Sequence, residues 1–277
     1  MLLFAVFLAL AILLMLLAPR ALTLSPWQIR RPRLALSFWF GAFFLSVAAL
    51  IAATLAAIYA EITAERPVDD WSSIFVTIIA WVSLFLLGGF LALIVTANEP
   101  LIESQRRTRA QLTPAGATDG GDKKLRVSSF ESEEYFAYAL PGKQPQILVS
   151  SPLISALNRQ QLQAVLAHEY AHLQQRHHWA MRIAEVNARC LPRIRAGQKL
   201  KRATMLLIEL IADDTAAKQV GPAPLANALS RLGSLSHDEA MQIRAERLTG
   251  RSWPAQKRRR IPETITNAFF APDTLAP

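Results

Sequence analysis

The sequence predicts a mainly α-helical membrane protein, with three N-terminal transmembrane helices followed by a small α+β domain. Hydrophobic residues make up 52% of the 277 residues, more than an ordinary soluble protein contains, and the excess is concentrated in the first hundred residues. Short runs with the composition of β-strands follow this apolar region. A strongly helical stretch then contains the motif His168-Glu169-x-x-His172.

Three apolar runs are each long enough to cross a bilayer, since a helix rises about 1.5 Å per residue. We expect the transmembrane region to fill residues 1–100, with spans at about residues 2–18, 34–60 and 71–97. A cleaved signal peptide is the alternative for the first run, but that run lacks a basic start and a small-residue cleavage site. Aromatic residues at or near the ends of the runs are expected to anchor them at the interfaces: Trp27, Trp39, Tyr59 and Trp71.

Charges beside the apolar runs predict their orientation. The first loop is rich in arginine, the second is mainly acidic, and Arg106, Arg107 and Arg109 follow the third run. Under the positive-inside rule, the N-terminus lies outside the cell and everything after residue 100 lies in the cytoplasm. These basic loops also account for the formal net charge of +9. The single cysteine, Cys190, excludes an intrachain disulfide, which fits a reducing compartment.

Residues 101–124 are expected to form a linker, because glycine and proline gather in its second half. A folded domain is expected at residues 125–250, and it begins with three short runs that predict a small sheet. The last run, Gln146–Ser150, is our candidate for a sheet edge to which an extended peptide adds as a strand. A purely structural hairpin is the alternative.

Residues 251–277 are expected to form a mobile, basic tail that contains proline. Within it, Lys257-Arg258-Arg259-Arg260 is interpreted as a cluster that faces solvent or anionic lipid. A DNA-binding membrane regulator is the alternative, but no recognition-helix module accompanies the cluster. We therefore expect no specific nucleic-acid partner.

The motif His168-Glu169-x-x-His172 predicts a metal site. Residues four apart lie one turn apart on the same face of a helix, so both imidazoles can reach one ion. Two histidines at this spacing suit zinc, and Glu169 is placed to take a proton from a zinc-bound water. Asn158 and Gln161 predict a capping box that starts the helix. A helix that merely happens to hold two histidines is the alternative, and the glutamate between them argues against it.

A catalytic zinc takes three protein ligands and leaves a fourth position for water. The candidates for the third ligand are His177, His178, Glu185, Glu209, Asp213 and Asp214. Glu209 is preferred because it lies in an otherwise almost wholly apolar stretch, where an unpaired carboxylate would be costly. Asp213, one turn further on, can hold a ligand histidine by its second nitrogen. A charged helix exit is the alternative for both aspartates.

The pattern His168-Glu-x-x-His172 followed by Glu209-x-x-Ala-Asp213, behind several N-terminal spans, resembles the integral-membrane gluzincin peptidases. Within this group the BlaR/MecR-type family is the nearest match, and the HtpX and CAAX prenyl-protease group is a more distant relative. The resemblance implies a small gluzincin-type α+β domain in the cytoplasm. It also implies one Zn²⁺ per chain bound by His168, His172 and Glu209, with Glu169 as general base and acid.

The sequence differs from the family in one respect, and two further residues match it only loosely. Antibiotic-sensing members carry a large extracellular penicillin-binding domain that this sequence does not show, so we expect a separate sensor protein. Family analogy points to a cytoplasmic repressor or a membrane protein as substrate. His237 and Arg244 loosely match the places of a transition-state-stabilising histidine and a structural arginine in related peptidases. A non-catalytic membrane adaptor that retains the metal motif as structure stays open as an alternative.

Overall fold

The computed structural model describes residues 2–22, 26–63, 71–112, 125–190, 193 and 195–253. The chain forms two compact units. The first contains Met1–Ser104 and Met181–Leu207, and the second contains Gln105–Ala180 and Ile208–Pro277. The acidic loop from residue 64, the linker from residue 113 and the basic tail from residue 254 lie outside the described residues.

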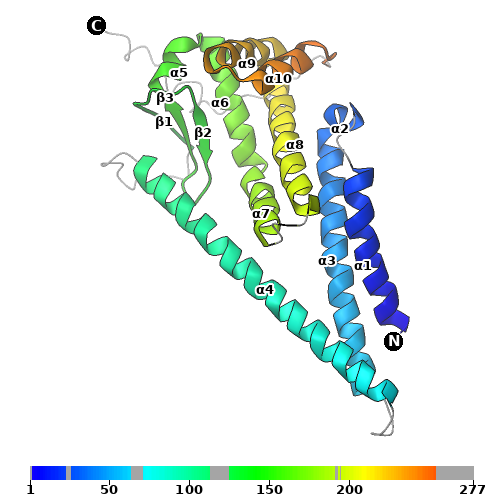
Figure 1. Cartoon of the computed structure of the whole chain (residues 1–277). Helices are drawn as coiled ribbons and strands as arrows, with labels where there is room; N and C mark the ends of the chain where they lie inside the picture. The colour runs from blue at the N-terminus through cyan, green and yellow to red at the C-terminus, as the bar shows by residue number, and fades with distance from the viewer. Residues whose placement is uncertain are drawn as a thin grey trace. The chain divides into compact units, whose positions relative to one another are not determined.

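The apolar N-terminal region is helical, as the sequence predicts. Its helices are α1 (Leu2–Ala21), the short α2 (Pro26–Arg30), α3 (Pro32–Ile62) and α4 (Trp71–Leu112), drawn from blue to cyan in Figure 1. Two stretches are long and apolar enough to cross a membrane, Pro32–Ile62 and Thr77–Thr96. The apolar part of α1, Leu2–Ala18, is shorter. Two candidate spans are therefore present, and a third span at α1 stays a prediction.

Helix α4 corrects the predicted linker. It continues without a break to Leu112, so the first half of the expected linker at residues 101–124 is helical. The physical reason lies in the composition of residues 101–112, which contain neither glycine nor proline and are rich in Arg, Leu and Gln. These residues favour a helix, whereas the glycine and proline that suggested a linker occur only later.

Trp39 of α3 is not the exposed interface anchor that the sequence suggested. It is only 5% exposed and packs in a cluster with Ala35, Ala184, Leu200, Ala203 and Leu207. The other three proposed anchors, Trp27, Tyr59 and Trp71, are exposed. Trp39 is buried because the helical hairpin of residues 181–207 belongs to the same compact unit as α3.

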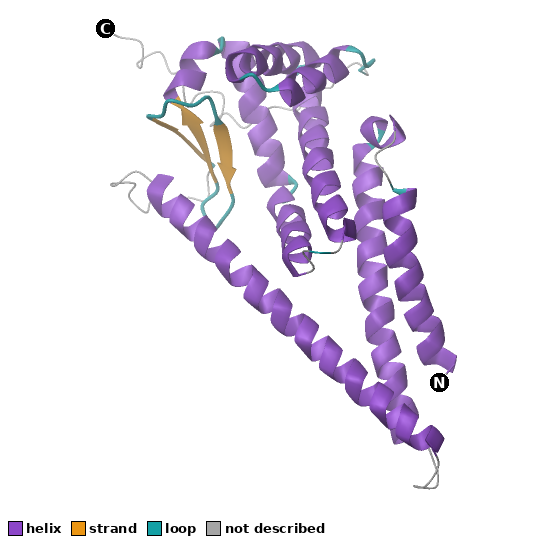
Figure 2. Ribbon diagram, in the orientation of Figure 1, coloured by secondary structure: helices purple, strands orange, loops and turns teal. Residues whose placement is uncertain are grey.

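The second unit begins with a three-stranded sheet, orange in Figure 2, made of β1 (Arg126–Phe130), β2 (Ala137–Leu140) and β3 (Gln146–Ser150). The strand order is β1-β3-β2, with β3 parallel to β1 and antiparallel to β2. Our choice of Gln146–Ser150 as a sheet edge is therefore wrong. Ile147, Leu148 and Val149 are fully buried, as residues of a central strand covered on both faces usually are.

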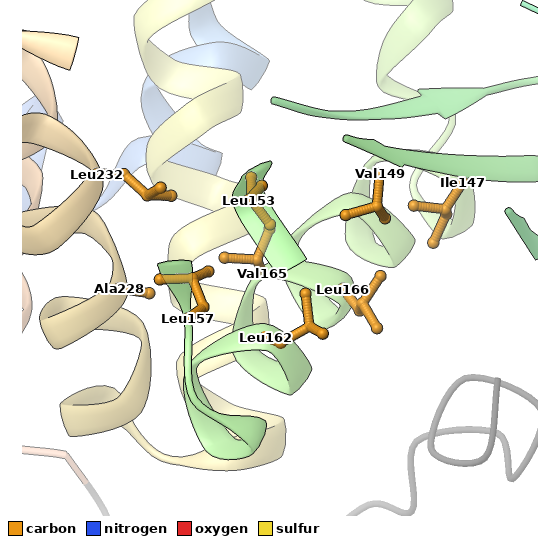
Figure 3. Close-up of a cluster of buried hydrophobic side chains, with 9 residues drawn as sticks. All are labelled: Ile147, Val149, Leu153, Leu157, Leu162, Val165, Leu166, Ala228 and Leu232. Carbon is orange, nitrogen blue, oxygen red and sulfur yellow. The ribbon is translucent and has the colours of Figure 1, made fainter. Parts of the chain in front are cut away.

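In the described part of the chain, the sheet is followed by α5 (Ser151–Ala156), α6 (Arg159–Gln174), α7 (His177–Cys190), α8 (Arg195–Val220), α9 (Pro222–Ser236) and α10 (Glu239–Thr249). The main core of the second unit joins β3 to α5, α6 and α9 (Figure 3). Leu162, Val165 and Leu166 of α6 project into this core. The histidines of the motif lie on a neighbouring side of α6, since His172 follows Val165 by two helical turns.

Candidate metal centre

Helix α6 carries the histidine motif, and its start is the capping box that the sequence predicts. The Asn158 side chain accepts a hydrogen bond from the Gln161 backbone N–H (2.9 Å), and the Asn158 N–H donates to Oε1 of Gln161 (3.0 Å). Both bonds satisfy donors that a helix start would otherwise leave unpaired. The register fixed in this way brings Nε2 of His168 to 3.1 Å from Nε2 of His172, one turn later.

Glu209 of α8 completes a group of three potential ligands with these histidines. Its Oε2 lies 3.4 Å from Nε2 of His168, and its Oε1 lies 3.5 Å from Nε2 of His172. Two ligands of a tetrahedral zinc ion, each bound at about 2.0–2.1 Å, are about 3.3 Å apart. The donor set and its spacing therefore fit a single zinc ion, which the three side chains would hold.

Asp213 and Arg244 contact the potential ligands His168 and Glu209. Oδ1 of Asp213 lies 2.9 Å from Nδ1 of His168, the nitrogen that faces away from His172. Arg244 of α10 donates to both carboxylate oxygens of Asp213, at 2.8 and 2.7 Å, and its Nη1 lies 2.9 Å from Oε2 of Glu209. The Arg244 guanidinium therefore links Glu209, a potential ligand, to Asp213, the carboxylate that contacts His168. Such outer contacts orient ligands and tune the ion that they bind.

The charges of this cluster shift its pKa values in opposite directions. Burial would lower the pKa of His168, but Asp213 and Glu209 outweigh it and raise that pKa to about 10. Burial and the nearby His168 lower the pKa of His172 to about 3. Burial would raise the pKa of Glu209, but His168 and Arg244 lower it to about 2. Asp213 behaves similarly, because Arg244 and His168 overcome its burial and hold its pKa well below the usual range.

Glu169 lies next to His168 on α6 and close to strand β2. Burial raises the pKa of its carboxyl to about 7, and a hydrogen bond from the Ala139 backbone N–H partly opposes that rise. The register explains why this N–H is available. Ser150 donates to the Phe136 carbonyl (2.9 Å), so alternate residues of β2 pair with β3, and Ala137 and Ala139 direct their backbone groups outward.

Strand β2 is therefore the edge that borders the histidine motif, in place of β3. One of its outward groups already contacts Glu169, and β2 packs against α6. Sequence alone could not find this edge, because the strand order depends on β1 pairing with β3 across twenty residues.

The remaining candidates lie in other surroundings. His177 contacts His172 through Nδ1 at 3.2 Å rather than joining the three ligand atoms. Glu185 pairs with Arg189 and Lys201 in the first unit. Asp214 pairs with Arg247 and Arg251. Neither aspartate marks a helix exit, because α8 continues to Val220.

His237 and Arg244, which the sequence treats alike, differ in their surroundings. Arg244 is buried at the ligands, whereas His237 is exposed at the C-terminal end of α9, in a left-handed conformation (φ 56°). The contacts described above for the ligand group do not include His237. Its proposed role in stabilising a transition state remains a prediction that this geometry does not support.

The sequence did not reveal the contacts that Arg244 makes. Asp213 and Arg244 are separated by a helix and two turns, and their pairing appears only when α10 packs on α9. Gly233 of α9 permits this approach, since a Cβ there would lie 3.1 Å from Cβ of Met241. The only indication of these contacts in the sequence was the spacing of Arg244, Arg247 and Arg251. It places two cations on one side of α10 and a third just after the end of that helix.

These features together define a zinc-peptidase type of site: two histidines one turn apart, a glutamate from a second helix and an acidic residue beside the first histidine. A comparison with protein-family models matches residues 103–245 to peptidase family M48. The match covers just over half of the chain and every residue of the centre described above. The chain belongs to peptidase family M48, whose members are zinc-dependent metallopeptidases. Searches of the curated proteins and of the solved structures find no match.

Proposed function

We propose that the protein is a membrane-bound zinc endopeptidase, with one Zn²⁺ per chain held by His168, His172 and Glu209. The observation that carries the proposal is the convergence of these three ligand atoms within 4.8 Å of one another, beside Glu169 on the same helix. A bound zinc ion would polarise the scissile carbonyl and lower the pKa of an attacking water. The residues around it then orient the substrate and move the protons.

Glu169 acts in this proposal as general base and then as general acid. Its place next to His168 puts the carboxylate beside the ligand group without making it a ligand. It removes a proton from the water as the water attacks the peptide carbon. It later delivers that proton to the departing amine nitrogen.

The outward backbone groups of β2 bind the substrate. A peptide in extended conformation adds to this edge as a fourth strand and pairs with the backbone groups of Ala137 and with the carbonyl of Ala139, whose N–H is directed at Glu169. This places the peptide backbone beside Glu169, because the Ala139 N–H already contacts that carboxylate. Arg244 and Asp213 keep Glu209 and His168 in position during the reaction.

The helices α3 and α4 anchor this peptidase in the lipid bilayer, with α1 as a third span. The charges beside the apolar runs orient the N-terminus to the outside and the peptidase to the cytoplasm. In this arrangement the substrates are cytoplasmic proteins or membrane proteins with cytoplasmic segments. Regulatory cleavage of a repressor, as the BlaR/MecR-type resemblance implies, belongs to this class.

The test uses the full-length protein purified in detergent. We expect about one zinc per chain by metal analysis and cleavage of an unfolded protein substrate that stops when a chelator is added. The variant Glu169→Gln should retain zinc and lose cleavage. Glu185→Gln is the matched control, because it removes a carboxylate of the first unit and should leave cleavage intact.

Either of two results would reject the proposal. One is a Glu169→Gln protein that still cleaves, which would remove the general base from the mechanism. The other is a wild-type protein that holds zinc but shows no chelator-sensitive cleavage of any protein offered to it, which would favour the adaptor. Comparing the proteomes of cells that carry the wild-type and Glu169→Gln forms would then identify substrates.

A further inference from the structure

The two ligand histidines have different partners on their second nitrogen. Nδ1 of His168 faces the Asp213 carboxylate at 2.9 Å, which is the common way to fix a zinc-binding imidazole. Nδ1 of His172 faces another imidazole, since Nδ1 of His177 lies 3.2 Å away. The two rings are nearly perpendicular, at 86°, with centroids 5.0 Å apart.

We propose that His177 is a positioning residue that holds His172 for zinc by accepting a hydrogen bond from its Nδ1–H. This inference rests on the proposed zinc site and goes beyond it, because His177 is not one of the three ligands. It replaces the role that the sequence allowed for His177 as a candidate third ligand.

The direction of the hydrogen bond follows from proton counting. A neutral histidine that binds a metal through Nε2 carries its one proton on Nδ1. Nε2 of His172 is the atom that faces Glu209 and His168, so its Nδ1 must be the donor. Nδ1 of His177 must then accept, and His177 carries its own proton on Nε2.

The local backbone brings His177 to this place. Helix α6 ends at Gln174, and the chain turns through Arg176, whose φ of 52° is a left-handed conformation that residues other than glycine rarely adopt. A hydrogen bond to another helix helps to hold this turn: the Gln175 side chain donates to Thr215 of α8 at 2.8 Å. As a result His177, the first residue of α7, is directed back at His172 and is only 4% exposed.

A buried histidine in contact with a ligand histidine is expected to do what Asp213 does for His168, with a neutral acceptor in place of an anion. Without an acceptor, the His172 ring is free to rotate or to adopt the tautomer with its proton on Nε2, which cannot bind zinc through that nitrogen. The two ligand histidines are then oriented by different groups: His168 by the Asp213 carboxylate and His172 by the neutral imidazole of His177.

Two substitutions at His177 separate the hydrogen bond from simple packing. Asparagine places its side-chain oxygen near the position of Nδ1, whereas glutamine places its oxygen nearer the position of Nε2. Both are polar and similar in size to histidine. His177→Asn should therefore preserve the acceptor for His172, and His177→Gln should remove it.

The measurements are zinc affinity, by competition with a chelator, and the visible spectrum of the Co²⁺-substituted protein, both on the full-length chain in detergent. We expect His177→Gln to weaken zinc binding by about 10- to 100-fold and to change the Co²⁺ spectrum, and His177→Asn to stay within about threefold of wild type. Gln175→Ala is the control for loosening of the turn: it leaves the acceptor in place, so it should lower the melting temperature and weaken zinc binding by less than His177→Gln does.

Three results would overturn the inference: zinc affinity of His177→Gln within about threefold of wild type, equal losses for the asparagine and glutamine variants, or an equal loss for Gln175→Ala. If wild type binds one zinc and Glu169→Gln is inactive, such a result rejects the role of His177 alone. A wild-type protein that binds no zinc rejects the proposed function as well.

Discussion

Helix α3 and the core of the second unit distribute their side chains in opposite ways. In α3 most of the buried residues are small, such as Ala49, Ala53 and Ala57, with Trp39 as the exception, while Phe38 and Leu55 are 57% and 61% exposed. In the core of the second unit drawn in Figure 3, most of the buried residues are large aliphatic ones, mainly leucine with isoleucine and valine. Large apolar side chains on the outside of a helix are expected where lipid surrounds the protein. Large apolar side chains in the interior are expected where water surrounds it.

The spacing of the alanines sharpens this contrast. Ala49, Ala53 and Ala57 are four residues apart, so they lie along one side of α3, and α3 packs against α1. Small residues let two helices approach closely where lipid offers no hydrophobic drive to bring them together. The second unit instead concentrates buried ions at one place, around Asp213 and Arg244. The proposed packing against lipid and the proposed binding of a metal therefore fall in different regions, and four experiments test that division.

The largest effect is expected from the ligand group of the second unit. Glu209→Ala should abolish tight zinc binding, because two histidines alone leave the ion short of protein ligands. Asp213→Asn should weaken zinc binding by about 10- to 100-fold, since the amide supports His168 less well than a carboxylate. Metal analysis and chelator competition measure both. Unchanged zinc content in Glu209→Ala would remove Glu209 from the ligand set.

The same leucine-to-alanine change should have very different effects in the two regions. Leu166→Ala removes a fully buried side chain of α6 and should lower the free energy of unfolding by about 2–5 kcal/mol. Leu55→Ala removes an exposed side chain of α3 and should change it by less than about 0.5 kcal/mol. Denaturant unfolding of the detergent-solubilised protein measures both values. Equal losses would contradict the assignment of α3 to lipid.

Enlarging a buried alanine tests the packing of α3 directly. Ala53 is fully buried, so Ala53→Leu must force its neighbours apart and should destabilise the first unit by about 1–3 kcal/mol. Zinc affinity should not change. Leu55→Ala serves as the control on the exposed side of the same helix. If Ala53→Leu proves harmless in the unfolding assay, the small residues of α3 do not mediate close helix packing.

The smallest effect is expected at Glu185 of the first unit. Burial would raise the pKa of this carboxyl, but hydrogen bonds from Lys201 and Arg189 outweigh burial and lower it. A lowered pKa contributes stability above the unfolded value of 4.5, and that stability is lost as the pH falls through the folded value. Glu185→Gln should therefore cost about 0.2–1 kcal/mol at pH 7 and less below pH 4. A cost that grows as the pH falls would refute this ion-pair interpretation.

The parts of the fold that depend on local patterns were predictable from the sequence. Residues four apart on a helix bring His168 and His172 together whatever the tertiary structure, and Asn158 with Gln161 marks where that helix starts. The cost of leaving a charge in an apolar helix singled out Glu209. The helices of the apolar runs also follow from composition and length.

The parts that depend on distant pairing were not predictable. Strand β3 resembles an edge strand until β1 pairs with it in parallel, and Trp39 resembles an interface anchor until residues 181–207 cover it. The contacts of Arg244 need α10 to fold back on α9. The role of His177 was missed because a tight turn at Arg176, which nothing in the local composition announces, redirects the chain.

The outward edge of β2 has a consequence for selectivity. Ala137 and Ala139 offer only main-chain groups and methyl side chains there, so every polypeptide carries the partners that this strand needs. In a natively folded protein, these backbone N–H and C=O groups are already hydrogen-bonded within its own helices and sheets. Resistance to such an enzyme therefore comes mainly from the conformational stability of the target, and damaged or partly unravelled chains would be cut first.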